Sequence, residues 1–458
     1  MQLLKTPRTH RRHFLQTSAA AGAATLLHRQ SSPARAWEDD RRLEINKIKR
    51  TTVRLPYRTV PRRAMERELP HWRYVEVFHV HLKSGHSGIG ETLLYYTWGV
   101  SDDKDVERCM GKNAAALMWD DSLGAGLQMA LFDAVAKSLE VPIHRLLGEQ
   151  RHERTPLSWW NIDMPPADMA AECREAYRQG YMSYKTKGRP WFDLWAQVAA
   201  VSEVVPESFK VDMDFNDTLR DADRAIPILL ELEKNPRIDI YETPIPQSDV
   251  EGNRRICEAT RVNVALHYGS PNPVIAASQK ACDGFVIGGG ASGLMQSASF
   301  AATADLPFWL QLVGTGITAA FSLHFGAVCS HATWPAVNCH QLYQHDLLKK
   351  TIVVTDGFAE IPTAPGLGYE LDEAAIDHYR VTKPTERPNP PRLFEVSWPD
   401  GRRLFLASTD RVNFMLNAGN EEIIPFFTRG VQTRRIPNDG SDAWKQRFEK
   451  AQKQPFFE

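Results

Sequence analysis

The chain has 458 residues, of which 43% are hydrophobic and 24% charged, and its formal net charge is −1. A near-neutral chain without a stripe of lysine and arginine lacks the electrostatic footprint of a nucleic-acid-binding protein. No run of about 18 or more apolar residues occurs, so we expect no membrane-spanning helix. The composition therefore predicts a soluble enzyme or a binding protein of small molecules.

The first residues predict an export signal. Arg11 and Arg12 precede a weakly apolar stretch, rich in alanine and glycine, at residues 17–27, and residues 34–36 read Ala-Arg-Ala, a small-x-small cleavage site. This order is typical of a twin-arginine signal over residues 1–36 and predicts a periplasmic or extracellular protein. A disordered basic tail is the alternative interpretation.

Residues 45–155 have the pattern of an α+β domain. Residues 74–81 alternate as in a strand, a turn follows at Gly85, and a second strand returns from Ile89. A helix is predicted over residues 124–139, where Leu127, Leu131 and Val135 recur at helical spacing. The six cysteines of the whole chain show no C-x-x-C spacing, so we expect buried free thiols and no zinc site.

Residues 156–345 alternate short apolar runs with helical ones, which predicts a (β/α)8-type barrel. In such a barrel the chemistry lies at the carboxyl ends of the strands. The predicted strands are Leu157–Asn161, Ser183–Lys187, Phe209–Asp214, Ile238–Glu242, Val262–His267, Gly284–Gly288, Phe308–Val313 and Pro335–Cys339.

Charged residues stand at period-two spacing at the ends of three of these strands. Lys185 and Lys187 end the second, Asp212 and Asp214 end the third, and Glu242 ends the fourth. Side chains two apart on a strand share a face. Isolated charges are costly to bury, so the pattern predicts a site where lysines, carboxylates and a bound cation offset one another.

Residues 346–436 are predicted to return to the first domain, so that the two segments together form an α+β capping domain. This segment adds a hairpin in which residues 392–397 and 403–407 flank a turn of sequence Pro-Asp-Gly. Residues 437–458 are polar, and we expect a loose tail.

Three segments then resemble signature segments of a known family. Residues 84–91 are similar to its capping-domain turn, residues 129–148 to its cap helix and the segment that follows, and residues 364–368 to its closing segment. With the Lys-x-Lys pair at 185–187, they resemble the mandelate racemase/muconate lactonizing branch of the enolase superfamily over about residues 45–380. The resemblance implies a cap that closes over the mouth of the barrel.

The resemblance also implies a divalent cation, usually Mg²⁺, held by acids at the ends of strands three, four and five. By position, Asp212 and Glu242 match the first two ligands. Lys185 and Lys187 match the Lys-x-Lys motif, whose second lysine is typically the base. The ion binds a substrate carboxylate and stabilises the enediolate left when the neighbouring proton is removed.

The sequence departs from the family pattern at three strands. After strand five, where a third carboxylate is expected, residues 265–269 read Ala-Leu-His-Tyr-Gly. Residues 285–290 of strand six hold no ionisable group, and strand seven offers only Gln311. Racemisation with two bases is therefore not expected.

Three interpretations of the third ligand stay open. His267 supplies a nitrogen, which favours a softer ion such as Mn²⁺, Fe²⁺ or Zn²⁺. Asp214 completes the sphere, although the family usually has asparagine there. In the third, the metal has been lost, and His267 and the acids form ordinary hydrogen bonds and ion pairs.

Weaker candidates for substrate binding lie outside these strands. Tyr57 and Arg58 fall where the family's specificity loop would lie and suggest an anionic or polyhydroxy substrate. Gly289 and Gly290 belong to a glycine run before a helix, which can cradle an anion, and residues 314–316 form a second such run. A tight turn is the alternative for the first run.

Two function hypotheses follow. In the first, the protein is an isomerase or lyase of the dehydratase or cycloisomerase type. It is metal-dependent and abstracts a proton α to the carboxylate of a sugar acid or similar small molecule. In the second, it is a degenerate member that binds an acidic small molecule. A metal-free lyase using only the lysine pair lies between them. Members of the family often form homo-oligomers, and the oligomeric state of this protein stays open.

Overall fold

The computed structural model describes residues 41–96 and 99–458. The predicted signal at residues 1–36 lies outside this part of the chain. None of the described helices is long and apolar enough to cross a membrane. All six cysteines are free thiols, as predicted, and five of them are buried.

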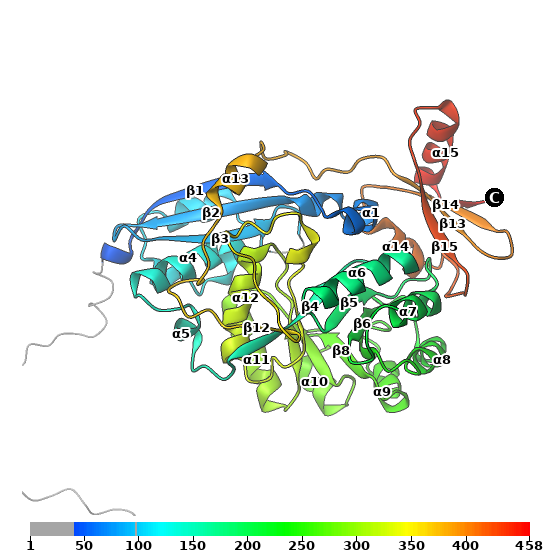
Figure 1. The fold of residues 1–458 in the computed structure, drawn as a ribbon, viewed down its shortest axis with the longest axis horizontal. Coiled ribbons are helices and arrows are strands. Elements are labelled where there is room, and N and C mark those ends of the chain that lie inside the picture. The colour runs from blue at the N-terminus through cyan, green and yellow to red at the C-terminus, as the bar shows by residue number, and fades with distance from the viewer. Residues whose placement is uncertain (1–40, 97–98) are drawn as a thin grey trace, which may run out of the picture. The chain divides into compact units, whose positions relative to one another are not determined.

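The N-terminal domain packs helix α4 against an antiparallel sheet of strand order β1-β2-β3 (Figure 1). Gly88 and Gly90 allow this close approach, because a Cβ atom at either position would lie 2.1 Å from a carbonyl oxygen of α4. The strands are β1 (Ile45–Arg54), β2 (Tyr74–Leu82) and β3 (Ser87–Leu93), and the helices are α1 (Thr59–Glu68), α2 (Asp103–Cys109), α3 (Ala114–Leu117), α4 (Ala125–Ser138) and α5 (His144–Leu147).

The middle of the chain forms a parallel sheet of order β10-β9-β8-β7-β6-β5-β4-β11. A parallel bridge between Gln311 and Val337 links its two ends, so the predicted barrel is confirmed. Its strands are β4 (Arg154–Trp160), β5 (Ser183–Lys187), β6 (Lys210–Asp214), β7 (Ile238–Glu242), β8 (Asn263–His267), β9 (Gly284–Ile287), β10 (Phe308–Leu310) and β11 (Ala336–Val337). Its helices are α6 (Pro166–Arg178), α7 (Leu194–Ser202), α8 (Ala222–Leu232), α9 (Val250–Ala259), α10 (Pro273–Ser278), α11 (Ala291–Thr303) and α12 (Gly316–Val328).

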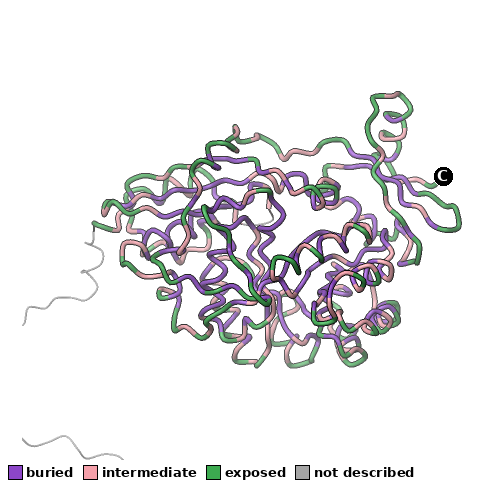
Figure 2. Tube along the Cα trace, in the orientation of Figure 1, coloured by how far each residue is buried: buried purple, intermediate pink, exposed green. Residues whose placement is uncertain are grey.

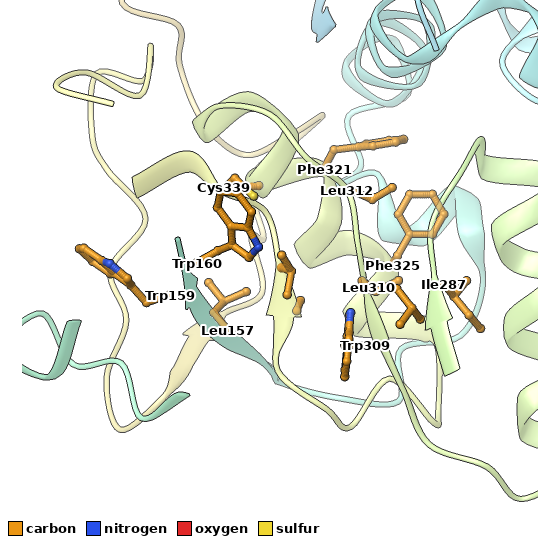
Figure 3. Packing of buried hydrophobic residues seen from close by; sticks show 14 of the residues in the cluster. Leu157, Trp159, Trp160, Ile287, Trp309, Leu310, Leu312, Phe321, Phe325 and Cys339 are labelled. Atoms are coloured by element: carbon orange, nitrogen blue, oxygen red, sulfur yellow. The ribbon is translucent and has the colours of Figure 1, made fainter. Parts of the chain in front are cut away.

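The strands run largely through the buried part of the molecule, as Figure 2 shows. Large apolar side chains fill the space around β4, β9, β10 and α12, among them Trp159, Trp309 and Phe325 (Figure 3). Trp159 and Trp309 are each 1% exposed. This packing fixes the strands that carry the charged residues.

The chain after the barrel contains more ordered structure than predicted. The tail expected to be loose forms a helix and a strand, because Trp444 and Ala451 bury against Leu393, Phe405 and Ala407 of a four-stranded sheet of order β15-β13-β14-β16. The elements are β12 (Phe358–Glu360), α13 (Glu373–Tyr379), β13 (Leu393–Ser397), β14 (Arg403–Ala407), α14 (Phe414–Asn420), β15 (Gln432–Ile436), α15 (Asp442–Lys453) and β16 (Phe456–Phe457).

Candidate active site

The register of three neighbouring strands places the charged residues in two layers. Lys185 lies opposite Asp212 in the lower layer, and Lys187 opposite Asp214 in the upper one. Asp214 in turn lies opposite Glu242, whereas the register partner of Asp212 on β7 is Ile240. The upper layer, at the carboxyl end of the barrel, therefore holds Lys187, Asp214 and Glu242.

The side chain of Lys185 extends upward from the lower layer. Its ammonium donates to Glu242 Oε2, lies 3.9 Å from Asp214 Oδ2, and sits 5.0 Å from the ring centroid of Trp309. Lys185 and Glu242 are each 1% exposed, so the pair is fully desolvated. Burial disfavours the charge of either group, but their mutual attraction prevails, and it raises the pKa of Lys185 and lowers that of Glu242.

His267 at the end of β8 completes this cluster on the solvent side. Its Nε2 atom lies 2.8 Å from Glu242 Oε1, and its side chain is 41% exposed. Burial opposes protonation, but the hydrogen bond and the charge of Glu242 outweigh it, and the pKa of His267 is raised. The structure therefore brings His267 to Glu242 as a charge-assisted partner.

Lys187 is the accessible member of the lysine pair. Its side chain is 18% exposed and its ammonium donates to Asp214 Oδ2. Asp214 Oδ1 accepts from the backbone N–H of Asn216 at 2.8 Å. The family's pattern of an aspartate followed two positions later by an asparagine is thus met by Asp214 and Asn216. That spacing is the signal by which the sequence could have indicated Asp214, in preference to Asp212, as the partner of Glu242.

Asp212 is left without a cationic partner. Its Oδ2 atom accepts from Ser183 Oγ at 3.0 Å, and its Oδ1 atom has no hydrogen-bond partner among the described residues. Burial, together with the nearby charge of Asp239, raises the pKa of Asp212 to about 8. At neutral pH we therefore expect a protonated carboxyl beneath the site.

This protonation predicts a pH-dependent gain in stability for Asp212→Asn. The ordinary carboxyl pKa is 3.8, so between pH 4 and pH 8 the unfolded wild-type chain binds fewer protons than the folded one, and its stability falls as pH rises. The variant lacks this loss. We expect it to be more stable by on the order of a few kcal/mol at pH 8 and by much less at pH 4, measured by urea unfolding. Asp410→Asn, at an exposed position, is the control and should show no such trend. A gain that does not change with pH would contradict the assignment.

Above the upper layer lies a cavity of ≈ 280 Å³. Lys187, Asp214 and His267 line it, while Lys185, Glu242 and Asp212 lie below its surface. Trp72, Tyr96 and Trp160 form an aromatic part of its wall, which the sequence did not indicate. Trp72 from the cap stacks on Trp160 of β4 with ring centroids 5.6 Å apart, and it meets Tyr96 edge to face at 5.3 Å. The remaining lining residues are Glu68, Leu69, Ile162, Arg189, Asn216, Gln311, Val313, Val337, Cys339, Asn413 and Leu416.

The predicted divalent cation does not fit these residues as they are arranged. Both oxygens of Glu242 already contact Lys185 and His267, and both oxygens of Asp214 accept hydrogen bonds from Lys187 and Asn216. Two ammonium groups face these two carboxylates, and the raised pKa of Asp212 favours its neutral form at neutral pH, so little negative charge remains to bind a dication. In residues 41–96 and 99–458, no three His, Cys, Asp or Glu side chains are grouped as metal ligands.

The weaker candidates from the cap lie outside this cavity. The Tyr57 hydroxyl is buried and donates to the Leu69 carbonyl. The Arg58 guanidinium pairs with Glu172, lies over the ring of Trp159, and lines a different cavity. Their expected contact with a substrate at the lysines is therefore not supported.

Neither predicted anion cradle is open to a ligand anion. The Asp121 carboxylate accepts from the backbone N–H groups of Ser292 and Gly293, directly after Gly289 and Gly290. The Glu91 carboxylate likewise accepts from the N–H groups of Thr315 and Thr318. Carboxylates favour helix N-termini, and these two fasten the cap to helices α11 and α12. Substrate binding by Gly289 and Gly290 stays a prediction.

A capped (β/α)8 barrel with lysines and acids at the carboxyl ends of its strands defines a class of enzyme-like barrel proteins. Comparison with known proteins shows what the chain is similar to. Residues 168–375 match the family described as enolase C-terminal domain-like, and residues 8–28 match the twin-arginine translocation signal sequence. The predicted mandelate racemase/muconate lactonizing resemblance and the twin-arginine signal are thereby confirmed.

Curated relatives of the chain bear the names of enzymes. It is 24% identical to an arabinonate dehydratase of Saccharolobus solfataricus, over 66% of this chain and 89% of the relative. It is 23% identical to a chloromuconate cycloisomerase of Cupriavidus pinatubonensis, over 60% of this chain and 77% of the relative. It is 26% identical to an N-succinyl-L-Arg/Lys racemase of Bacillus cereus, over 32% of this chain but only 39% of the relative. The prediction that the protein is an enzyme is confirmed.

A solved structure shows the same fold. The crystal structure of muconate cycloisomerase from Pseudomonas fluorescens superposes on this chain with a TM-score of 0.61 at 21% identity. The superposition covers 74% of this chain and 99% of the cycloisomerase chain. The barrel and its α+β cap are therefore confirmed at the level of the fold.

Proposed function

We propose that the protein is an isomerase or lyase that removes a proton from the carbon next to a carboxylate of a small acid. The observation that carries this proposal is the division of the lysine pair. Lys187 reaches the cavity, whereas Lys185 is buried beneath it and bound to Glu242. In this proposal Lys187 accepts the proton, after the ammonium that pairs with Asp214 has released one of its own protons to solvent.

Among the reactions considered, dehydration suits the cavity best. His267 carries a raised pKa and is 41% exposed, so it can donate a proton to a departing hydroxyl. With a 2,3-dihydroxy acid, the C2 proton goes to Lys187 and the C3–O bond breaks. The hydroxyl takes a proton from His267 and leaves as water, and the enol becomes a 2-keto acid. Gln311 and Val313 of the opposite wall offer no second base, which disfavours racemisation.

The substrate class proposed is a sugar acid or a similar small carboxylate. The relatives named above act, by name, on arabinonate, on chloromuconate and on N-succinyl-L-Arg/Lys, all of which are carboxylates. The raised pKa of His267 favours its cation, and in this proposal that cation and the ammonium formed when Lys187 takes the proton stabilise the charge that develops on the substrate carboxylate. The twin-arginine signal supports a periplasmic or extracellular site of action.

A divalent cation, Mg²⁺ or Mn²⁺, is the cofactor typical of the superfamily, and metal dependence stays a prediction for this chain. The occupied carboxylates favour proton abstraction without it. The same observation favours the second candidate function, a degenerate member that binds an acid without turning it over.

The test is exchange of the α-hydrogen with solvent deuterium, followed by NMR. D-gluconate, D-arabinonate and N-succinyl-L-lysine serve as probes, first with a chelator and then with added Mg²⁺ or Mn²⁺. We expect exchange or elimination of at least one acid, and persistence with the chelator. Activity that depends on the metal would show that a cation displaces the lysines. Binding of an acid without exchange would establish the degenerate binder.

A further inference from the structure

Residues 392–458, the C-terminal extension, follow the end of the matched family segment at residue 375. They form the four-stranded sheet β15-β13-β14-β16 with helices α14 and α15 (Figure 1, orange to red). The sheet shares an apolar cluster with Trp191 and Phe192, which lie between β5 and α7 of the barrel. The extension is therefore packed on the barrel near the strand that carries the lysines.

Helix α14 is held from two sides. On the cap side, Glu68 Oε1 accepts from the N–H groups of Met415 and Leu416, at 2.9 and 3.3 Å. On the barrel side, Arg220 donates to the carbonyls of Gly419 and Ile424. Asn420 donates to the backbone carbonyl of Asn216, a residue that lines the cavity. These contacts fix the helix between the cap and the barrel mouth.

Two residues at the start of α14 line the cavity together with Lys187, namely Asn413 and Leu416. Asn413 adopts the left-handed conformation, with φ at 57°. Among the described residues no hydrogen-bond partner is found for its side-chain amide, whereas the amide of Asn417 on the same helix donates to the Val412 carbonyl. Glu68 Oε1 accepts from two backbone N–H groups and its Oε2 lies 3.9 Å from Arg67 Nε, and the Arg189 guanidinium donates to the carbonyls of Asp214 and Phe215. The free polar group on this wall is thus an uncharged amide.

We propose that α14 forms the wall that selects the part of the substrate remote from its acidic carbon. Asn413 hydrogen-bonds an uncharged polar group there, a hydroxyl or an amide, and Leu416 limits the size of that part. The inference rests on the proposed function and adds a substrate class to it, carboxylates with a polar but uncharged remote end. A cavity of ≈ 280 Å³ is small for a ligand site, so one side chain on its wall has a large influence.

Two substitutions and one control test the proposal in the full mature chain. Asn413→Gly removes the amide and keeps the left-handed backbone, which glycine adopts freely. Leu416→Trp fills the cavity. Asn417→Ala, one turn further along α14 and outside the cavity lining, is the control. The probes are D-gluconate and D-arabinonate, each compared with its analogue that lacks the terminal hydroxyl, and the readouts are the dissociation constant by calorimetry and kcat/KM for exchange.

We expect Asn413→Gly to weaken the binding of the hydroxylated acids by about tenfold or more, because an unpaired hydroxyl is costly in a closed site. Binding of the deoxy analogues should weaken by less than about threefold. Leu416→Trp should weaken the binding of the hydroxylated acids and of the deoxy analogues by about a hundredfold each. The Asn417→Ala control should leave the binding of all these acids unchanged. Unchanged discrimination in Asn413→Gly, with exchange intact, would overturn the inference and leave the proposed function standing. If Asn413→Gly changes binding but no probe exchanges its hydrogen, the inference on α14 stands and the proposed function is overturned. If the wild type binds no probe, both are overturned.

Discussion

Replacement of Lys187 by methionine is expected to lower the rate of α-hydrogen exchange by about 10²–10⁴-fold, the contribution typical of a general base. Methionine has a similar length and keeps the apolar stem in the cavity wall. The variant lacks only the amine that accepts the proton. Since Asp214 Oδ1 still accepts from Asn216, and Asp214 Oδ2 still lies 3.9 Å from the Lys185 ammonium, we expect the fold to persist.

The matched control is Lys210→Met on the neighbouring strand. Lys210 begins β6 at the opposite end of the barrel, where its ammonium donates to the Pro236 carbonyl. This variant should exchange at the wild-type rate. Dissociation constants for the acids, measured in both variants, separate a loss of chemistry from a loss of binding. Exchange in Lys187→Met within about threefold of wild type would remove Lys187 from the role of base.

Sequence patterns located much of the barrel because they report local burial. β5 and β7 begin and end where predicted, at Ser183–Lys187 and Ile238–Glu242, and four of the five residues in each strand are buried. The predicted third and fifth strands begin one residue early. The sixth strand is one residue shorter at its end, the seventh stops at Leu310, and the eighth is reduced to Ala336–Val337. Strand ends depend on pairing with neighbours, which a single sequence pattern does not encode.

The relative height of the acids could not be predicted for the same reason. Between Val211 and Asp212 the pairing of β6 with β7 shifts by one residue, since Val211 lies opposite Ile238 and Asp212 opposite Ile240. Such a bulge re-aims the side chains that follow it. It brings Asp214 beside Glu242 and leaves Asp212 opposite an isoleucine. Period-two spacing gave the correct face of each strand but contains no information on this shift.

The cavity wall from α14 was also beyond local patterns. Asn413 and Leu416 reach the barrel mouth only because Glu68, more than 340 positions earlier in the chain, binds the N–H groups of Met415 and Leu416. The same holds for α15, because its Trp444 packs on an apolar surface that β13 and β14 form together when they pair. Contacts between residues so far apart in the sequence shape the cavity wall, and the local spacing of apolar residues does not reveal them.

Lys185→Met is expected to destabilise the protein by about 3–5 kcal/mol, because loss of one partner leaves a buried charge uncompensated. Glu242, 1% exposed, would retain only His267, and methionine cannot replace the ammonium near the Trp309 ring. In the wild type the lowered pKa of Glu242 stabilises the fold above the ordinary carboxyl pKa of 4.5, and this stability is lost as pH falls below it. Without Lys185 that acid-side loss should shrink, since the Glu242 pKa rises.

The double variant Lys185→Met/Glu242→Gln distinguishes an ion pair from simple packing. A neutral amide in place of the carboxylate removes the uncompensated charge, so we expect the double variant to recover to within about 1–2 kcal/mol of the wild type in urea unfolding at pH 7. Effects of the two substitutions that simply add would contradict a direct pair. Recovery of both stability and α-hydrogen exchange would show that the Lys185–Glu242 pair supports the fold, while the chemistry belongs to Lys187 and the other residues that face the cavity. Recovery of stability alone would show that the pair also contributes to the chemistry.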